Sequence, residues 1–210
     1  MQPALTTLEE KVLPVHTALL VIDMQNDFCA EGGYVHKLRG ADMSSNAPLA
    51  RRIMALVRAA RQAGATVLWI RANYEPKYLS EQALAKQSGS GMVCCAAGSW
   101  GWQFFEVAPA PDELILEKHS YSGFAGTELD RLLRFRGIRT LVFAGVASNV
   151  CVDSTLRDGY FRGYHVVLAE DCVDSYARDL HAATLKNVKL YFGEVCRAVQ
   201  VERSWSQCAA

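Results

Sequence analysis

The sequence carries no excess of charge of either sign and contains no long hydrophobic run. Its 210 residues include 22 Lys and Arg against 22 Asp and Glu, so the formal net charge is zero. A protein that binds nucleic acid by neutralising phosphates usually shows a basic excess. The longest apolar runs are about seven residues, whereas a helix that crosses a bilayer needs roughly 20. We therefore expect neither a nucleic-acid partner nor an association with the membrane.

The N-terminal segment lacks the basic stretch and following apolar stretch of a secretory signal. The cysteines number seven, which is odd, and they show neither a Cys-x-x-Cys pair nor a metal-ligand spacing with histidine. In a reducing compartment such cysteines stay free thiols. We therefore expect a cytoplasmic protein without a disulfide framework.

Apolar stretches of strand length alternate with helical patterns along the chain. The strands are continuously apolar, which suits a parallel sheet covered by helices on both faces. This pattern predicts an α/β fold: a doubly wound, mostly parallel six-stranded sheet with helices on both faces, in one domain over residues 1–210. The predicted strands span 17–23, 65–71, 113–117, 140–145, 165–170 and 198–201, and the predicted helices span 48–63, 127–136, 149–162 and 180–192.

The segment 73–111 breaks this alternation. It is irregular, contains several Gly and Pro residues, and carries Trp100 and Trp102. Long irregular connections inside a domain are usually functional. We expect an insertion that forms part of a pocket, although a surface excursion or an oligomer contact is the competing interpretation.

Three chemically active side chains lie at or just after predicted strand ends: Asp23, Lys118 and Cys151. Ligands of open parallel sheets bind at the carboxyl ends of the strands. Cys151 begins a predicted helix, and both a helix N-terminus and a nearby ammonium favour the nucleophilic thiolate. A carboxylate can move a proton between the thiol, the leaving group and water. The sequence therefore indicates a hydrolytic site, against the alternatives of a strand-end cap, a surface lysine and an inert buried thiol.

These three residues fall in segments that resemble the motifs of the isochorismatase-like cysteine hydrolases. The resemblance implies that Asp23, Lys118 and Cys151 form a catalytic triad and that a cis peptide joins Val146 to Ala147. It further implies that the amides of Ala147 and Cys151 hold the oxyanion, that no cofactor is needed and that the protein is a homodimer or homotetramer. The matching segments are VIDMQNDF at 21–28, KHSYSGF at 118–124 and GVASNVCV at 145–152.

The family contains several chemistries, and departures from its motifs separate them. No histidine lies between His36 and His119, so the Asp-x-His metal motif of nicotinamidases is missing and no metal is expected. Cys151 favours hydrolysis of an amide C–N bond over cleavage of a vinyl ether. Segments 121–124 and 151–159 look most like members that act on ureido and carbamoyl compounds, which include biuret and triuret hydrolases, ureidoacrylate amidohydrolases and N-carbamoylsarcosine amidase.

The resemblance thus implies a cysteine-dependent amidohydrolase that releases ammonia from a small ureido or carbamoyl amide through a covalent intermediate. The alternatives are an isochorismatase-type vinyl-ether hydrolase and an amidase for maleamate or a nicotinamide-like amide. Gln25 and Asn26 either bind the substrate or brace the triad, and strand alternation turns His119 away from Lys118 into a structural role. The candidate substrate contacts are Phe28, Gln25, Asn26, Tyr121 and Asn73.

Overall fold

Parallel strands form the centre of the molecule, in the spatial order β3-β2-β1-β4-β5-β6. The computed structural model describes residues 4–87 and 91–208. Every strand pairing in this part of the chain is parallel, so the predicted α/β fold is confirmed and the sheet is more uniform than "mostly parallel". The strands are β1 (Thr17–Ile22), β2 (Thr66–Ala72), β3 (Leu114–Lys118), β4 (Thr140–Val146), β5 (His165–Asp174) and β6 (Glu194–Cys196).

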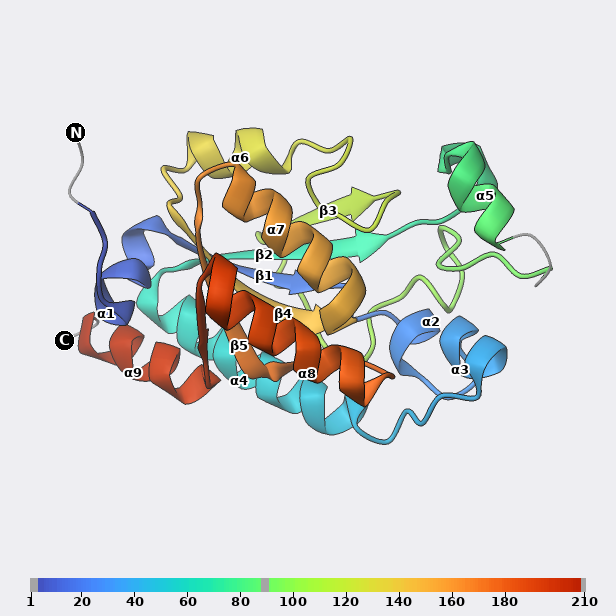
Figure 1. Ribbon diagram of the computed structural model, residues 1–210, viewed down its shortest axis with the longest axis horizontal. Helices are drawn as coiled ribbons and strands as arrows, with labels where there is room; N and C mark the ends of the chain where they lie inside the picture. The colour runs from blue at the N-terminus through green and yellow to red at the C-terminus, as the bar shows by residue number, and fades with distance from the viewer. Residues whose placement is uncertain (1–3, 88–90, 209–210) are drawn as a thin grey trace.

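Helices cover both faces of this sheet (Figure 1). The helix α4 packs with α9 on one face, and α6, α7 and α8 lie over the other. The α-helices are α1 (Leu8–Lys11), α2 (Asn26–Cys29), α3 (Tyr34–Arg39), α4 (Asn46–Ala63), α5 (Glu81–Gln87), α6 (Leu129–Phe135), α7 (Asp153–Phe161), α8 (Arg178–Asn187) and α9 (Ala198–Cys208). The short helical turns are η1 (Pro14–His16), η2 (Pro76–Tyr78), η3 (Ser148–Val152) and η4 (Val188–Phe192).

Strand β1 shows why continuous apolar strands are needed here. Leu19 and Val21 belong to the core on the α4 side, whereas Leu20 and Ile22 belong to the core on the α6–α7 side. Successive side chains of a strand point to opposite faces, so both sets must be apolar when helices cover both faces.

The chain builds β1, β2 and β3 outward in one direction and then returns to place β4 on the other side of β1. The switch point between β1 and β4 is where an open α/β sheet leaves a crevice for a ligand. Figure 1 shows α2, α3 and α5 gathered beyond the carboxyl ends of the strands. Segment 73–111 includes η2 and α5, so it is more ordered than the irregular insertion that the sequence suggests.

The prediction of a strand at 198–201 is wrong. The last strand is β6, which spans only three residues, and 198–201 forms the first turn of α9. Ala198, Val201 and Trp205 are all buried on one side of this helix, at the i, i+3, i+7 spacing of an amphipathic helix. In the part of the chain that the structure describes, no helix is long and apolar enough to span a bilayer.

Candidate active site

Asp23 follows β1 at the switch point and takes a backbone conformation that is uncommon for residues other than glycine. Its φ is 53°, and its side chain is 1% exposed. The neighbouring strand approaches closely there, because Gly145 has φ 114° and an added Cβ would lie 2.0 Å from the carbonyl oxygen of Ile22. The glycine therefore lets the ends of β1 and β4 converge beside the carboxylate.

Lys118, the last residue of β3, is fully buried and meets Asp23 across the end of the sheet. Its Nζ lies 2.9 Å from Asp23 Oδ2. The same ammonium donates to the Ser120 carbonyl at 2.9 Å and lies 3.5 Å from Cys151 Sγ. The partners of the Asp23 carboxylate are thus the other two members of this cluster, Lys118 and Cys151. A carboxylate that lies beside a thiol can accept the thiol proton.

Cys151 lies in the turn η3, between the end of β4 and the start of α7, and is 6% exposed. The structure thus brings Asp23, Lys118 and Cys151 together from three strand ends. The peptide bond between Val146 and Ala147 is cis, and both residues line the same cavity as Cys151. The amides of Ala147 and Cys151 stay our predicted oxyanion donors.

Electrostatics in this cluster favour a neutral thiol in the free protein. Burial, followed by the negative charge of Asp23, raises the pKa of Cys151 to about 12, although Lys118 acts in the opposite direction. Desolvation of the charged sulfur therefore outweighs the favourable effect of Lys118. Burial also raises the pKa of Asp23, which Lys118 partly offsets. A raised pKa makes this carboxylate a stronger proton acceptor.

The pKa of Lys118 reflects two opposing effects. Burial by itself lowers it, but the charges of Asp23 and Cys151 outweigh burial and raise it. The lysine therefore stays an ammonium, and its charge balances whichever of the two partners is ionised.

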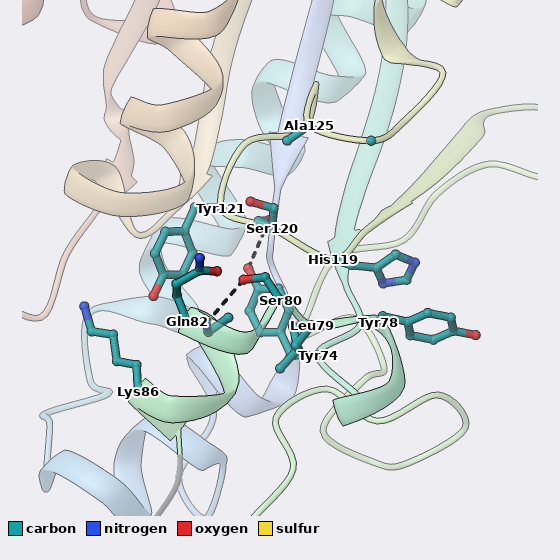
Figure 2. A pocket seen from close by; sticks show the side chains of 12 residues that line it. Tyr74, Tyr78, Leu79, Ser80, Gln82, Lys86, His119, Ser120, Tyr121 and Ala125 are labelled. Carbon is teal, nitrogen blue, oxygen red and sulfur yellow. Dashed lines mark hydrogen bonds between the residues drawn. The ribbon is translucent and has the colours of Figure 1, made fainter.

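Tyr74 is a member of this cluster that the sequence reasoning missed. Its hydroxyl accepts a hydrogen bond from Lys118 Nζ at 2.9 Å, lies 3.8 Å from Cys151 Sγ and donates to the Ser120 carbonyl at 3.2 Å. Figure 2 shows the last of these bonds. Burial raises the pKa of Tyr74 well above its ordinary value, so it stays a neutral donor. Its place near the lysine could have been predicted from the sequence, because Tyr74 lies two residues beyond Ala72, which pairs with Lys118 in the sheet.

A cavity of about 650 Å³ opens above Cys151. This volume lies within the usual range for small-molecule sites. Phe28 and Tyr121, two of the predicted substrate contacts, line it, and so do Asn149 and Tyr176. The triad therefore lies at the base of a pocket that can hold a small organic substrate.

Comparisons with known proteins agree with this geometry. The model of the isochorismatase domain matches residues 17–200. The chain belongs to the isochorismatase family. It is 37% identical over 206 residues to the ureidoacrylate amidohydrolase RutB of Methylorubrum extorquens, covering 90% of this chain and 83% of the relative.

Solved structures of this family share the fold. A cysteine hydrolase from Pseudomonas syringae pv. phaseolicola superposes with a TM-score of 0.85 at 27% identity, covering 99% of this chain and 100% of the other. The N-carbamoylsarcosine amidase of Thermoplasma acidophilum gives 0.66 at 28% identity, covering 87% and 96%. The expected membership of the isochorismatase-like family is therefore confirmed.

Three of the predicted substrate contacts, Gln25, Asn26 and Asn73, make hydrogen bonds within the protein and are absent from the cavity lining in the described part of the chain. The amide of Gln25 donates to the carbonyls of Ala72 and Trp102 and accepts from the Ala72 N–H at 2.7 Å. Asn26 donates to the carbonyl of Trp100 at 2.8 Å. Asn73 is 1% exposed and donates to Glu117 at 3.0 Å. Through these bonds Gln25 and Asn26 hold segment 100–103 against the end of β1.

The segment after β2, where nicotinamidases of the family carry their metal motif, is occupied by internal contacts in this protein. Asn73 binds Glu117, and Glu75 pairs with Lys77. His119 contacts the Asn73 carbonyl through Nδ1 and stacks on Tyr78, in agreement with a structural role. These residues are therefore committed to holding the insertion in place.

Asp27, Cys94 and Cys95 place their ligand-type atoms within 4.8 Å of one another. Both oxygens of Asp27 already accept backbone N–H groups, from Tyr34 at 3.0 Å and from Cys95 at 2.6 Å. Because its oxygens are used in this way, Asp27 pins the insertion to α3. This cluster therefore has a structural role.

Proposed function

We propose that this protein is a cysteine-dependent amidohydrolase that cleaves a C–N bond of a small ureido or carbamoyl compound. The observation that carries the proposal is the buried contact of Asp23 and Lys118 with Cys151 at the base of the cavity. Relatives named ureidoacrylate amidohydrolase and N-carbamoylsarcosine amidase support this substrate class. A ureido carbonyl placed over Cys151 Sγ has an amine or ammonia as its leaving group.

The proposed reaction begins when the substrate displaces water from the cavity. Asp23 accepts the thiol proton as the sulfur of Cys151 attacks the carbonyl, and Lys118 compensates the charge of whichever partner is ionised. The amides of Ala147 and Cys151 hold the oxyanion; removing one such donor typically costs roughly 2.7–4 kcal/mol. Asp23 then protonates the departing ammonia or amine, which leaves a carbamoyl thioester on the cysteine.

The second half of the reaction regenerates the enzyme. Asp23, again a carboxylate, removes a proton from a water molecule that attacks the thioester carbonyl. The C–S bond breaks, the sulfur regains a proton from Asp23, and a carbamic acid leaves. All proton transfers run through Asp23, and we propose that neither a metal nor an organic cofactor takes part.

Three further features belong to this proposal. The protein is one domain whose insertion at 73–111 closes the side of the pocket, since Tyr74, Lys86 and Cys94 of that segment line the cavity. It acts in the cytoplasm as a homodimer or homotetramer. The exposed aromatic side chains of Phe161 and Tyr191, at the ends of α7 and η4, support an interface between copies.

An ammonia-release screen tests the proposal. Wild-type protein is offered ureidoacrylate, N-carbamoyl amino acids, biuret, triuret, maleamate and nicotinamide, beside Cys151→Ala and Asp23→Asn. Cys196→Ala is the matched control, because Cys196 is buried in β6 outside the cavity. We expect ammonia from a ureido compound with wild type and the control, and none above background with the two site variants. Release of pyruvate from isochorismate instead would identify a vinyl-ether hydrolase.

A further inference from the structure

The walls of the catalytic cavity contain more positive than negative charge. Among the described residues that line it, the formally charged side chains are Asp23, Arg39 and Lys86. Asp23 is already paired with Lys118 beneath the cavity floor. The remaining charge on the walls is therefore two cations, although the chain as a whole is neutral.

Neither cation is used to hold the fold together. Within residues 4–87 and 91–208, Arg39 and Lys86 take part in no ion pair, and both side chains are exposed. Other cations of the same region do have partners: Arg71 pairs with Glu117, and Lys77 pairs with Glu75. The two unpaired cations are therefore available to a ligand.

The two cations reach the cavity from different elements. Arg39 ends α3, and Lys86 lies in α5 of the insertion. Lys86 also lines an adjoining hollow of about 610 Å³, which shares Tyr74 and Tyr121 with the catalytic cavity. Figure 2 shows Lys86 extending from α5 past Gln82 on the side of Tyr121. The ammonium is thus placed where the two hollows meet.

The charges are unevenly distributed within the cavity. The carboxylate of Asp23 is buried beside Cys151, whereas the two cations that line the cavity are exposed. An anionic group is therefore attracted to the part of the cavity that the two cations line. A neutral ureido group needs no such cation and can lie at the sulfur.

We propose that Lys86 and Arg39 form an anion subsite that holds the carboxylate of a ureido acid while its ureido carbonyl lies over Cys151 Sγ. The proposal rests on the proposed hydrolytic function and narrows its substrate class, from ureido compounds in general to those that carry a carboxylate. Neutral compounds such as biuret and triuret gain nothing from the subsite.

The test compares substrates that differ in charge. Steady-state kinetics are measured for ureidoacrylate and 3-ureidopropionate, and for the neutral compounds biuret and 3-ureidopropionamide, with wild type, Lys86→Met and Arg39→Met. Lys37→Met is the matched control, because Lys37 is an exposed cation of the same helix α3 that does not line the cavity. It removes the same charge from the protein.

We expect the two subsite variants to raise KM for the ureido acids by roughly tenfold or more, the loss expected for a hydrogen bond to a charged group. Their kcat for the acids and their kcat/KM for the neutral compounds should stay within about twofold of wild type, as should every constant of the control. Equal losses for acids and neutral compounds, or no loss for the acids, would overturn the subsite. A wild-type preference for biuret would overturn it as well.

A second readout separates this proposal from the hydrolytic one. If wild type releases no ammonia from any ureido compound, the proposed function is wrong, and the subsite is judged from ligand protection alone. In that case 3-ureidopropionate should protect Cys151 from iodoacetamide better than 3-ureidopropionamide does, and Lys86→Met should abolish the difference. Equal protection by the acid and the amide would contradict the subsite.

Discussion

Replacing Asp23 by asparagine should abolish hydrolysis and yet make the free enzyme's Cys151 more reactive toward alkylation. The negative charge of Asp23 is, after burial, the largest contribution that raises the pKa of the thiol, whereas Lys118 lowers it. Asparagine keeps the shape of the side chain and removes the charge. Lys118 then acts on the sulfur against burial alone, so the thiol ionises at lower pH.

The size of the effect follows from the pKa. A thiol with a pKa near its ordinary value of 9.0 is about one-tenth ionised at pH 8, whereas one with a pKa of about 12 is ionised in about one molecule in ten thousand. Each unit of pKa removed raises the thiolate fraction about tenfold but lowers thiolate nucleophilicity about threefold. Because burial persists in the variant, we expect only part of the rise to be reversed. A decrease of one to two units gives an alkylation rate roughly 3- to 10-fold above wild type.

The assay is the rate of carbamidomethylation of the Cys151 peptide by iodoacetamide at pH 8, followed by mass spectrometry beside ammonia release. Lys118→Met, which removes the opposing charge, should slow alkylation further below wild type. Circular dichroism checks that each variant keeps its fold. An Asp23→Asn variant that alkylates at the wild-type rate or slower would refute the electrostatic reasoning, and one that still hydrolyses substrate would refute the assignment of Asp23.

Three further predictions concern residues around the triad. Tyr74→Phe removes the hydroxyl next to Lys118 Nζ and should lower kcat/KM by roughly 10- to 100-fold, the effect of losing a hydrogen bond to a charged group. Tyr78→Phe is the matched control, and a Tyr74→Phe variant as active as wild type would contradict a role for Tyr74. Gly145→Ala places a methyl group 2.0 Å from a backbone oxygen of β1 and should lower the free energy of unfolding by at least about 2 kcal/mol in urea titrations; an unchanged midpoint would show that the strands can separate. Gln25→Ala leaves buried backbone groups unpaired and should lower the free energy of unfolding by about 1–3 kcal/mol for each group that water cannot reach. A change in KM without loss of stability would instead support Gln25 as a substrate contact.

The sheet and the triad were predictable from the sequence for the same physical reason. Strands buried on both faces must be continuously apolar, so a polar residue at their ends marks the carboxyl edge of the sheet. Asp23, Lys118 and the turn before Cys151 all lie at that edge. Parallel pairing then brings them together without any knowledge of side-chain positions.

The sixth strand was missed because a strand of three residues hardly differs from a loop in sequence. Its neighbour in the chain, α9, begins with the apolar residues Ala198 and Val201, and these four positions by themselves also fit a strand. The burial of Trp205 four residues further on shows the helical period, which a window longer than four residues would have revealed.

The roles of Gln25, Asn26 and Asn73 could not be predicted from position alone. Each lies beside the cavity in the sequence, but loop side chains can turn either toward a ligand or toward unpaired backbone groups. Their own neighbours offered such groups: the edge of β2 and the carbonyls of segment 100–103. Buried backbone groups must find partners, and these amides satisfy them.

The charge state of Cys151 was also beyond the sequence. The pattern showed a helix start and a lysine, both of which favour a thiolate. It did not show that the sulfur is buried beside a carboxylate. Desolvation depends on how the insertion and the surrounding loops cover the site, and no local motif encodes that.

In the proposed function, hydrolysis proceeds through a covalent bond to Cys151. Acid-quenched mass spectrometry during turnover of a ureido acid tests it most directly. We expect wild-type enzyme to carry a carbamoyl or N-substituted carbamoyl group on the peptide that contains Cys151, and Cys151→Ala to carry none and to release no ammonia. Steady turnover by Cys151→Ala at the wild-type rate, or an adduct on another cysteine, would contradict it.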